Sequence, residues 1–262
     1  VPAGEHASLI IAPGPGELDQ LVTAERDFSR SEPLQGSRDA EQQMQAALAH
    51  LRGLDPVPLM FINHPSRTAT GMGEWGQVTP RELRGWHAAA PNVLVGMEGA
   101  PGHQAASINP DGSIDSTGAR GGYRNSPTLG GFDQMTARLG GFWDSMLGEG
   151  RRWWITATSD SHSHWRDGGS DFWPGEYSKT YVHARREHRD VLDGVRNGRM
   201  FVTTGDLISE LDVTVKALGG RKTANMGGAI LANPGDDVEV APGVGHLDRD
   251  HPLDVEPVQQ PL

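Results

Sequence analysis

The chain of 262 residues contains no cysteine. It therefore has no disulfide bond, no thiolate metal ligand and no cysteine nucleophile. Any metal ion must be held by His, Asp and Glu side chains, a set that suits zinc, manganese or iron in a hydrolytic site. A chain without cysteine is compatible with both oxidising and reducing compartments. This leaves the localisation open between cytoplasmic and periplasmic or secreted.

The sequence also lacks long apolar runs and an excess of basic residues. No run reaches the roughly 18 apolar residues that a membrane-spanning helix needs, so we expect no membrane span. There are 34 acidic and 23 basic residues, which gives a formal net charge of -11. Because nucleic acids and anionic membranes attract basic surfaces, neither is an expected partner. A small-molecule substrate is expected instead, and the sequence does not indicate an oligomeric state.

Short apolar segments alternate with segments of helical periodicity over the first 205 residues. This alternation predicts an α/β fold with a mostly parallel sheet, either open or closed into a barrel. Functional groups gather at the carboxyl ends of the strands in both architectures. The predicted strands are 57–62, 92–96, 153–157, 179–184 and 200–203, and the predicted helices are 39–51, 79–86, 132–147 and 187–196.

The pattern changes after residue 204. We predict a main domain over 1–205, a partial β unit over 206–241 and a tail rich in Pro and Asp over 242–262. The Gly-rich segment 102–131 is too long for an ordinary connection, so it is predicted either to form a loop over the site or to be partly disordered.

Polar residues with metal-binding chemistry follow three of the predicted strands. His64, Glu98 and Asp160 each come directly after an apolar run, and His162 stands two positions beyond Asp160. Extended chain places Asp160 and His162 on the same side, where a carboxylate and an imidazole suit a divalent metal. An isolated Asp-x-His is also typical of a capped turn with a polar loop histidine. The three strand ends taken together predict a shared site.

Four segments resemble the PHP family of polymerase and histidinol phosphatase-like metallohydrolases. They are Phe61-Ile-Asn-His-Pro65, Val95-Gly-Met-Glu98, Thr158-Ser-Asp-Ser-His162 and the helix-to-strand segment 191–203. The segment 171–177 is similar to the carbaryl-hydrolase-like branch of that family. The resemblance covers roughly residues 57–205.

The resemblance implies a distorted (β/α) barrel with two or three metal ions at its carboxyl face. His64, Asp160 and His162 would then be metal ligands, and Glu98 either a ligand or a carboxylate that faces the substrate. The family's first strand carries a His-x-His motif, whereas the only His-x-His of this chain is His162-Ser-His164 within the last motif. We therefore expect a barrel lacking its first strands, with a small C-terminal β appendage. Glu5 is a candidate remnant of a mid-barrel ligand. The first strands either lie upstream or the metal centre has been lost.

The expected function is metal-dependent hydrolysis, in which a metal-activated water attacks a phosphoester or a carboxylic ester or carbamate. Asp160 and His162 are the expected catalytic pair. Arg67 offers a guanidinium for an anionic substrate, and His103 and His164 are further candidates for substrate binding. The alternative is a non-catalytic remnant of a PHP-like domain that serves for binding or as a scaffold.

Overall fold

The computed structural model describes residues 6–28, 40–102, 123, 126–161, 175, 178–204, 208–218 and 222–245. The chain divides into two compact units, Val1–Gly205 and Asp206–Leu262. No helix within these described ranges is long and apolar enough to cross a membrane.

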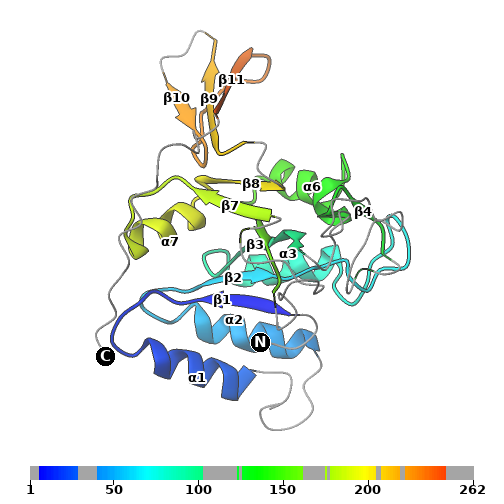
Figure 1. Ribbon diagram of the computed structural model, residues 1–262, viewed down its shortest axis with the longest axis vertical. Coiled ribbons are helices and arrows are strands. Elements are labelled where there is room, and N and C mark those ends of the chain that lie inside the picture. Colours follow the sequence, from blue (N-terminus) through cyan, green and yellow to red (C-terminus); the bar gives the residue numbers. More distant parts are fainter. Residues whose placement is uncertain are drawn as a thin grey trace. The chain divides into compact units, whose positions relative to one another are not determined.

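A four-stranded sheet forms the centre of the first unit (Figure 1). Its strands are β1 (Ala7–Ile10), β2 (Leu59–Ile62), β3 (Leu94–Pro101) and β6 (Trp154–Thr158), in the order β1-β2-β3-β6. The last three run parallel, whereas β1 pairs antiparallel with β2 at the edge. All residues of β2 and β3 are buried, as expected of strands covered on both faces.

Helices cover one face of this sheet. They include α1 (Glu17–Phe28), α2 (Ala40–Leu51) and α3 (Pro80–Ala89). Thr79 and Glu82 form a capping box at the start of α3, which fixes where that helix begins. The main hydrophobic core lies between these helices and the sheet and includes Met44, Leu48, Leu83, Trp86, Met60, Ile62, Leu94 and Met97.

A second cluster covers the opposite face of the sheet. It joins β2 and β3 to the helix α7 (His188–Arg196) and to the strands β7 (Ser178–Val182) and β8 (Met200–Thr204). Its buried members are Leu59, Phe61, Val95, Val195 and Met200.

The predicted barrel is wrong. In the described part of the first unit, the strands form the four-stranded mixed sheet and two separate antiparallel pairs, β7–β8 and β4–β5, and no closed barrel. The strands β4 (Thr128–Leu129) and β5 (Phe132–Asp133) are only two residues long each. Strand β7 meets β6 through its Thr180 hydroxyl, which donates to the carbonyl of Ala157 and accepts from its N–H, both at 2.8 Å. In a closed barrel, backbone hydrogen bonds would pair β6 with β7 at this place, whereas here the Thr180 side chain makes the hydrogen bonds.

The single helix predicted over 132–147 is also wrong. Phe132–Asp133 is strand β5, and two short helices follow, α5 (Gln134–Ala137) and α6 (Phe142–Gly148). Gly140 separates them at a φ of +69°, a left-handed conformation that ends helical geometry and that glycine adopts without a steric penalty. The predicted loop over 102–131 lies mostly outside the described residues.

The second unit contains a three-stranded antiparallel sheet. Its strands are β9 (Glu210–Ala217), β10 (Thr223–Asn225) and β11 (Val238–Gly245), in the order β10-β9-β11. Pro242 lies within β11, at the edge of the sheet, where a strand tolerates the missing N–H. Residues 246–262 are outside the described residues.

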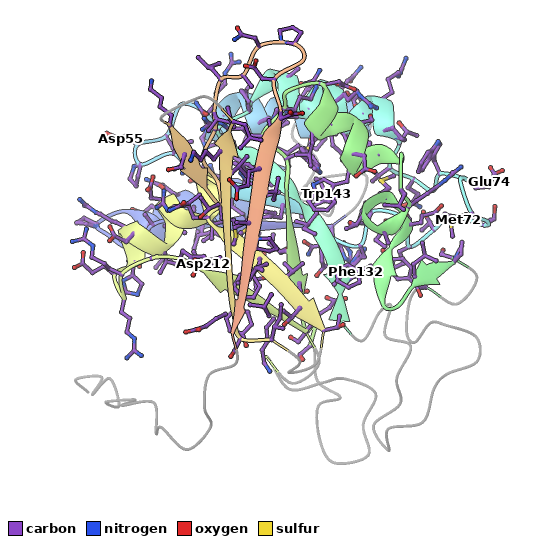
Figure 2. All side chains as sticks on the ribbon, turned by 90° about the horizontal axis from the view of Figure 1, so that it is seen from above. Asp55, Met72, Glu74, Phe132, Trp143 and Asp212 are labelled. Atoms are coloured by element: carbon purple, nitrogen blue, oxygen red, sulfur yellow. The ribbon has the colours of Figure 1, made fainter. Side chains whose placement is uncertain are left out.

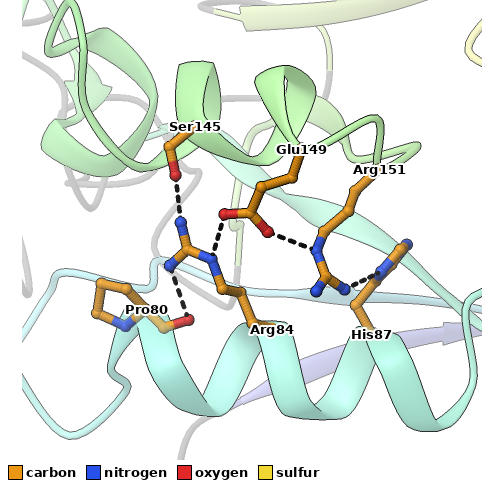
Figure 3. Close-up of polar contacts among 6 residues, drawn as sticks. All are labelled: Pro80, Arg84, His87, Ser145, Glu149 and Arg151. Atoms are coloured by element: carbon orange, nitrogen blue, oxygen red, sulfur yellow. Dashed lines mark hydrogen bonds and ion pairs between the residues drawn. The ribbon is translucent and has the colours of Figure 1, made fainter.

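A polar network joins α3 to α6 and the segment that follows it (Figure 3). Glu149 accepts from Arg84 Nε and Arg151 Nε, both at 2.7 Å, and Arg151 Nη1 lies 3.4 Å from His87 Nδ1. The ring of His87 is buried against Trp153, with 5.6 Å between the ring centroids. Its Nε2 has no hydrogen-bond partner among the described residues. Burial and the charge of Arg151 lower the pKa of His87.

Protonation of His87 is expected to destabilise the fold. Because its folded-state pKa is lowered, the unfolded chain binds the proton first, and stability is lost as pH falls from about 6.5 through the folded pKa. His87→Phe keeps an aromatic ring against Trp153 but cannot be protonated. We therefore expect the unfolding free energy of His87→Phe, measured by urea denaturation, to fall less than that of the wild type between about pH 7 and 5. Parallel pH profiles for the two proteins would contradict this.

Candidate functional site

The carboxyl ends of β2, β3 and β6 bring together the three strand-end residues singled out in the sequence. Glu98 lies in β3, while His64 and Asp160 follow β2 and β6 by two residues each. One oxygen of Glu98, Oε2, accepts from the backbone N–H of His64 at 2.8 Å. The other, Oε1, accepts from the hydroxyl of Thr158 at the end of β6. A single carboxylate therefore ties the ends of all three strands.

The backbone leaves β2 and β6 through unusual conformations. His64 has a φ of 31° and Asp160 a φ of 50°, both in the left-handed region. Such conformations cost a non-glycine residue on the order of 1 kcal/mol or more and cluster at functional sites. Both strained residues lie beside the same Glu98, which strengthens the assignment of a site to this edge of the sheet.

The titration of Glu98 is strongly affected by this environment. Its exposed fraction is 2%, and burial raises its pKa to about 7. The charges of Asp160 and Asp133 act in the same direction as burial, the bonds from Thr158 and His64 oppose the shift, and the pKa of about 7 is the net result. Among the described residues, the charged neighbours that act on Glu98 are carboxylates.

Asp133 lies beneath this site, and the sequence did not reveal its role. It has no exposed surface, and it accepts from Ser66 N (2.8 Å), Ser66 Oγ (2.7 Å), Met135 N (2.7 Å) and the hydroxyl of Tyr123. Burial raises its pKa, and these bonds oppose the rise. Because Ser66 is two residues beyond His64, Asp133 fixes the turn that carries the His64 imidazole. The helix predicted from residue 132 hid this residue, since it is the N-cap of α5.

His6 is a second residue that the sequence did not single out. Its ring centroid lies 5.1 Å from that of His64, and its carbonyl accepts from Asn63 N at 2.9 Å. The antiparallel register of β1 with β2, in which Ala7 pairs with Ile62, brings the two histidines together. The sequence interpretation chose the neighbouring Glu5 instead, which lies outside the described residues.

Of the remaining predicted site residues, the structure describes only Arg67. Arg67 is half-buried, and its carbonyl accepts from Ser126 Oγ at 2.7 Å. Like Glu5, the candidates His103, His162 and His164 fall outside the described residues.

The donor types at this edge fit a divalent metal, although the described residues do not complete a centre. Two imidazoles, His6 and His64, and two carboxylates, Glu98 and Asp160, gather where negative charge is in excess. Nitrogen and oxygen donors of this kind suit zinc, manganese or iron. Within the described ranges, however, no group of three or more His, Asp and Glu side chains is arranged to hold a metal ion. A complete centre would need donors from the rest of the chain.

Comparisons with known proteins add no further constraint on this site. No protein-family model matches the chain, and no curated protein or solved structure is similar enough to match it.

Proposed function

We propose that the carboxyl edge of β2, β3 and β6 is the centre of a metal-dependent hydrolase that acts on ester bonds. Phosphoesters are the first substrate class, and carboxylic esters or carbamates the second. The observation that carries the proposal is the buried carboxylate of Glu98, which binds the His64 turn and Thr158 and experiences the charge of Asp160. Three strand ends with metal-binding side chains around an excess of negative charge favour a cation at this place.

In this proposal, His64, Asp160 and His162 hold the metal, with Glu98 and Glu5 as further donors. A divalent ion, when bound, supplies Lewis-acid activation of water and of the ester. Glu98 positions the His64 turn through the N–H of that residue. Asp160 and His162 form the catalytic pair of this proposal.

Substrate binding is assigned to residues around this edge. Arg67 lies three residues beyond His64, in the turn that Asp133 fixes through Ser66. A guanidinium suits a phosphoryl group because it offers two parallel N–H donors. His103 and His164 complete the proposed substrate-binding set.

Metal content and hydrolysis test the proposal together. We expect the 262-residue protein to retain at least one zinc, manganese or iron ion after dialysis, measured by mass spectrometry, and to hydrolyse 4-nitrophenyl phosphate. Changing Asp160 and His162 to Ala together should remove both properties. As a matched control, the double change Asp19→Ala and His188→Ala removes the same side-chain types from exposed positions and should leave both properties unchanged.

The alternative is a non-catalytic remnant that serves for binding or as a scaffold. The many Gly- and Pro-rich loop segments and the small C-terminal β unit suit such a remnant. A protein that retains no metal and cleaves neither 4-nitrophenyl phosphate nor 4-nitrophenyl acetate would overturn the hydrolase proposal in favour of the remnant.

A further inference from the structure

A cavity of about 480 Å³ lies in the first unit at the opposite end of the sheet from the candidate site. It is lined by the segment 12–15 after β1, the first turns of α1, the segment 55–57 before β2 and one side of α7. Figure 2 labels Asp55, which is part of this lining. Val57 precedes β2 and His64 follows it, so roughly 20 Å of extended chain separates the two places. The volume is within the range of small-molecule sites.

Two arginines on the same side of α7 line the cavity. Arg189 and Arg196 are seven residues apart, with Leu192 and Asp193 between them on that side. Arg196 is fixed by neutral groups, since it donates to the carbonyls of Val57 (2.5 Å) and Asn92. Arg189 forms no hydrogen bond or ion pair with any described residue. Neither guanidinium is hydrogen-bonded to a carboxylate within the described chain, which favours an anionic ligand.

The carboxylates of the cavity limit how much negative charge a ligand can carry. Asp193 accepts hydrogen bonds from Arg199 (2.7 Å) and Asn197 (2.9 Å). Glu17 accepts one from the N–H of Gly14 (2.6 Å). Together with Asp55 they line the same space as the arginines. Because like charges repel at short range, three carboxylates disfavour a doubly charged phosphate and tolerate a single carboxylate.

Most of the remaining lining is apolar, and Gln20 is a further polar side chain in it. The apolar lining residues are Ala12, Pro13, Pro15, Pro56, Val57 and Leu192. These surfaces favour a ligand with an apolar body, since pockets of this kind combine apolar walls with a few polar groups that orient the ligand.

We infer that this cavity binds a small organic monocarboxylate with an apolar body, whose carboxylate is held by Arg189 beside the fixed guanidinium of Arg196. The site is separate from the proposed hydrolytic centre, and the inference does not depend on that function.

The test uses 4-phenylbutanoate as the probe, with its neutral amide and inorganic phosphate as comparison ligands. We expect the intact protein to bind 4-phenylbutanoate with a Kd on the order of 1 mM, as suits a ligand of this size. Titrations monitored by NMR should show binding weakened about tenfold by Arg189→Gln, which removes one charged hydrogen-bonding partner. Arg185→Gln is the matched control, because Arg185 is exposed, lies outside the cavity lining and pairs with Asp190. It should leave the Kd unchanged.

Three results would overturn the inference. The first is no binding of 4-phenylbutanoate, and the second is equal binding of the amide or of phosphate. The third is an Arg189→Gln protein that binds as tightly as the Arg185→Gln control. Arg189 is exposed and without a partner in the described residues, so its replacement is not expected to disturb folding.

Discussion

Replacing Glu98 with Gln is expected to stabilise the metal-depleted protein at alkaline pH. The pKa of Glu98 is raised from 4.5 to about 7 by burial. A carboxyl group with a raised folded-state pKa contributes stability that is fully present below the unfolded pKa and is lost as pH rises through the folded pKa. The glutamine side chain of the variant would keep nearly the shape of glutamate without acquiring a charge, and the loss of one of its two acceptor oxygens should cost about 1 kcal/mol at every pH. Before this cost is subtracted, the difference between a pKa of 4.5 and one of about 7 corresponds to a gain over the wild type of about 3 kcal/mol at about pH 8 and a small gain at about pH 5.

Urea denaturation across this pH range measures the effect. Glu149→Gln is a suitable control, because the neighbouring Arg151 and Arg84 lower the pKa of that exposed carboxylate. Its replacement should give no gain at alkaline pH. A stability difference between Glu98→Gln and the wild type that does not change with pH would contradict the assignment of a buried charge at this position.

The same substitution is expected to impair the proposed function. If Glu98 is a donor or supports the His64 donor, Glu98→Gln should weaken metal binding about tenfold to a hundredfold, with a parallel loss of hydrolysis. A gain in stability combined with a loss of function is typical of residues that are retained for a site and not for folding. Full metal content and activity in a stabilised Glu98→Gln protein would place Glu98 outside the centre.

Replacing Asp133 with Ala is expected to destabilise the protein by about 5 kcal/mol, which is a large share of the stability of most domains. The substitution leaves the Ser66 N–H and hydroxyl, the Met135 N–H and the Tyr123 hydroxyl without their acceptor. Each unsatisfied buried group costs about 1–3 kcal/mol. Urea denaturation, or the loss of the cooperative transition, measures the outcome.

Two further variants make this result interpretable. Asp133→Asn keeps an acceptor oxygen and should cost less than Asp133→Ala. Asp144→Ala removes an exposed aspartate that, among the described residues, accepts only from Gly140 N (2.6 Å), and it should cost about 1 kcal/mol or less. An effect of Asp133→Ala as small as that of Asp144→Ala would show that the buried cluster does not stabilise the turn after β2.

Local patterns predicted many of the elements but not their assembly. The apolar runs that form β2, β3 and β6 are strands, and the Thr79-Pro80 start of α3 is confirmed by its capping box. The helix predicted over 132–147 failed because its apolar spacing continues across Gly140, where the backbone cannot remain helical. The barrel failed for a different reason, since strand periodicity does not specify which strands pair.

The residues of the candidate site were likewise predicted only in part from local sequence patterns. His64, Glu98 and Asp160 were found because parallel strands place their carboxyl ends at one edge, so the strand pattern was enough to group them. His6 was missed because it precedes an antiparallel strand, and only the register of β1 with β2 reveals which side chain meets His64. Asp133 was missed because it fell inside the predicted helix and because its partner Ser66 lies 67 residues away in the sequence.

The sequence by itself determined the chemistry that this chain has available. Without cysteine, metal ligands are restricted to imidazoles and carboxylates, and polar residues at three strand ends mark one edge of a sheet. Only the tertiary structure decided that the sheet is open, that Glu98 is buried among carboxylates and that Asp133 fixes the His64 turn. The physical reason is that periodicity reports which side of an element is buried, whereas strand pairing, desolvation and charge proximity depend on residues brought together from distant parts of the chain.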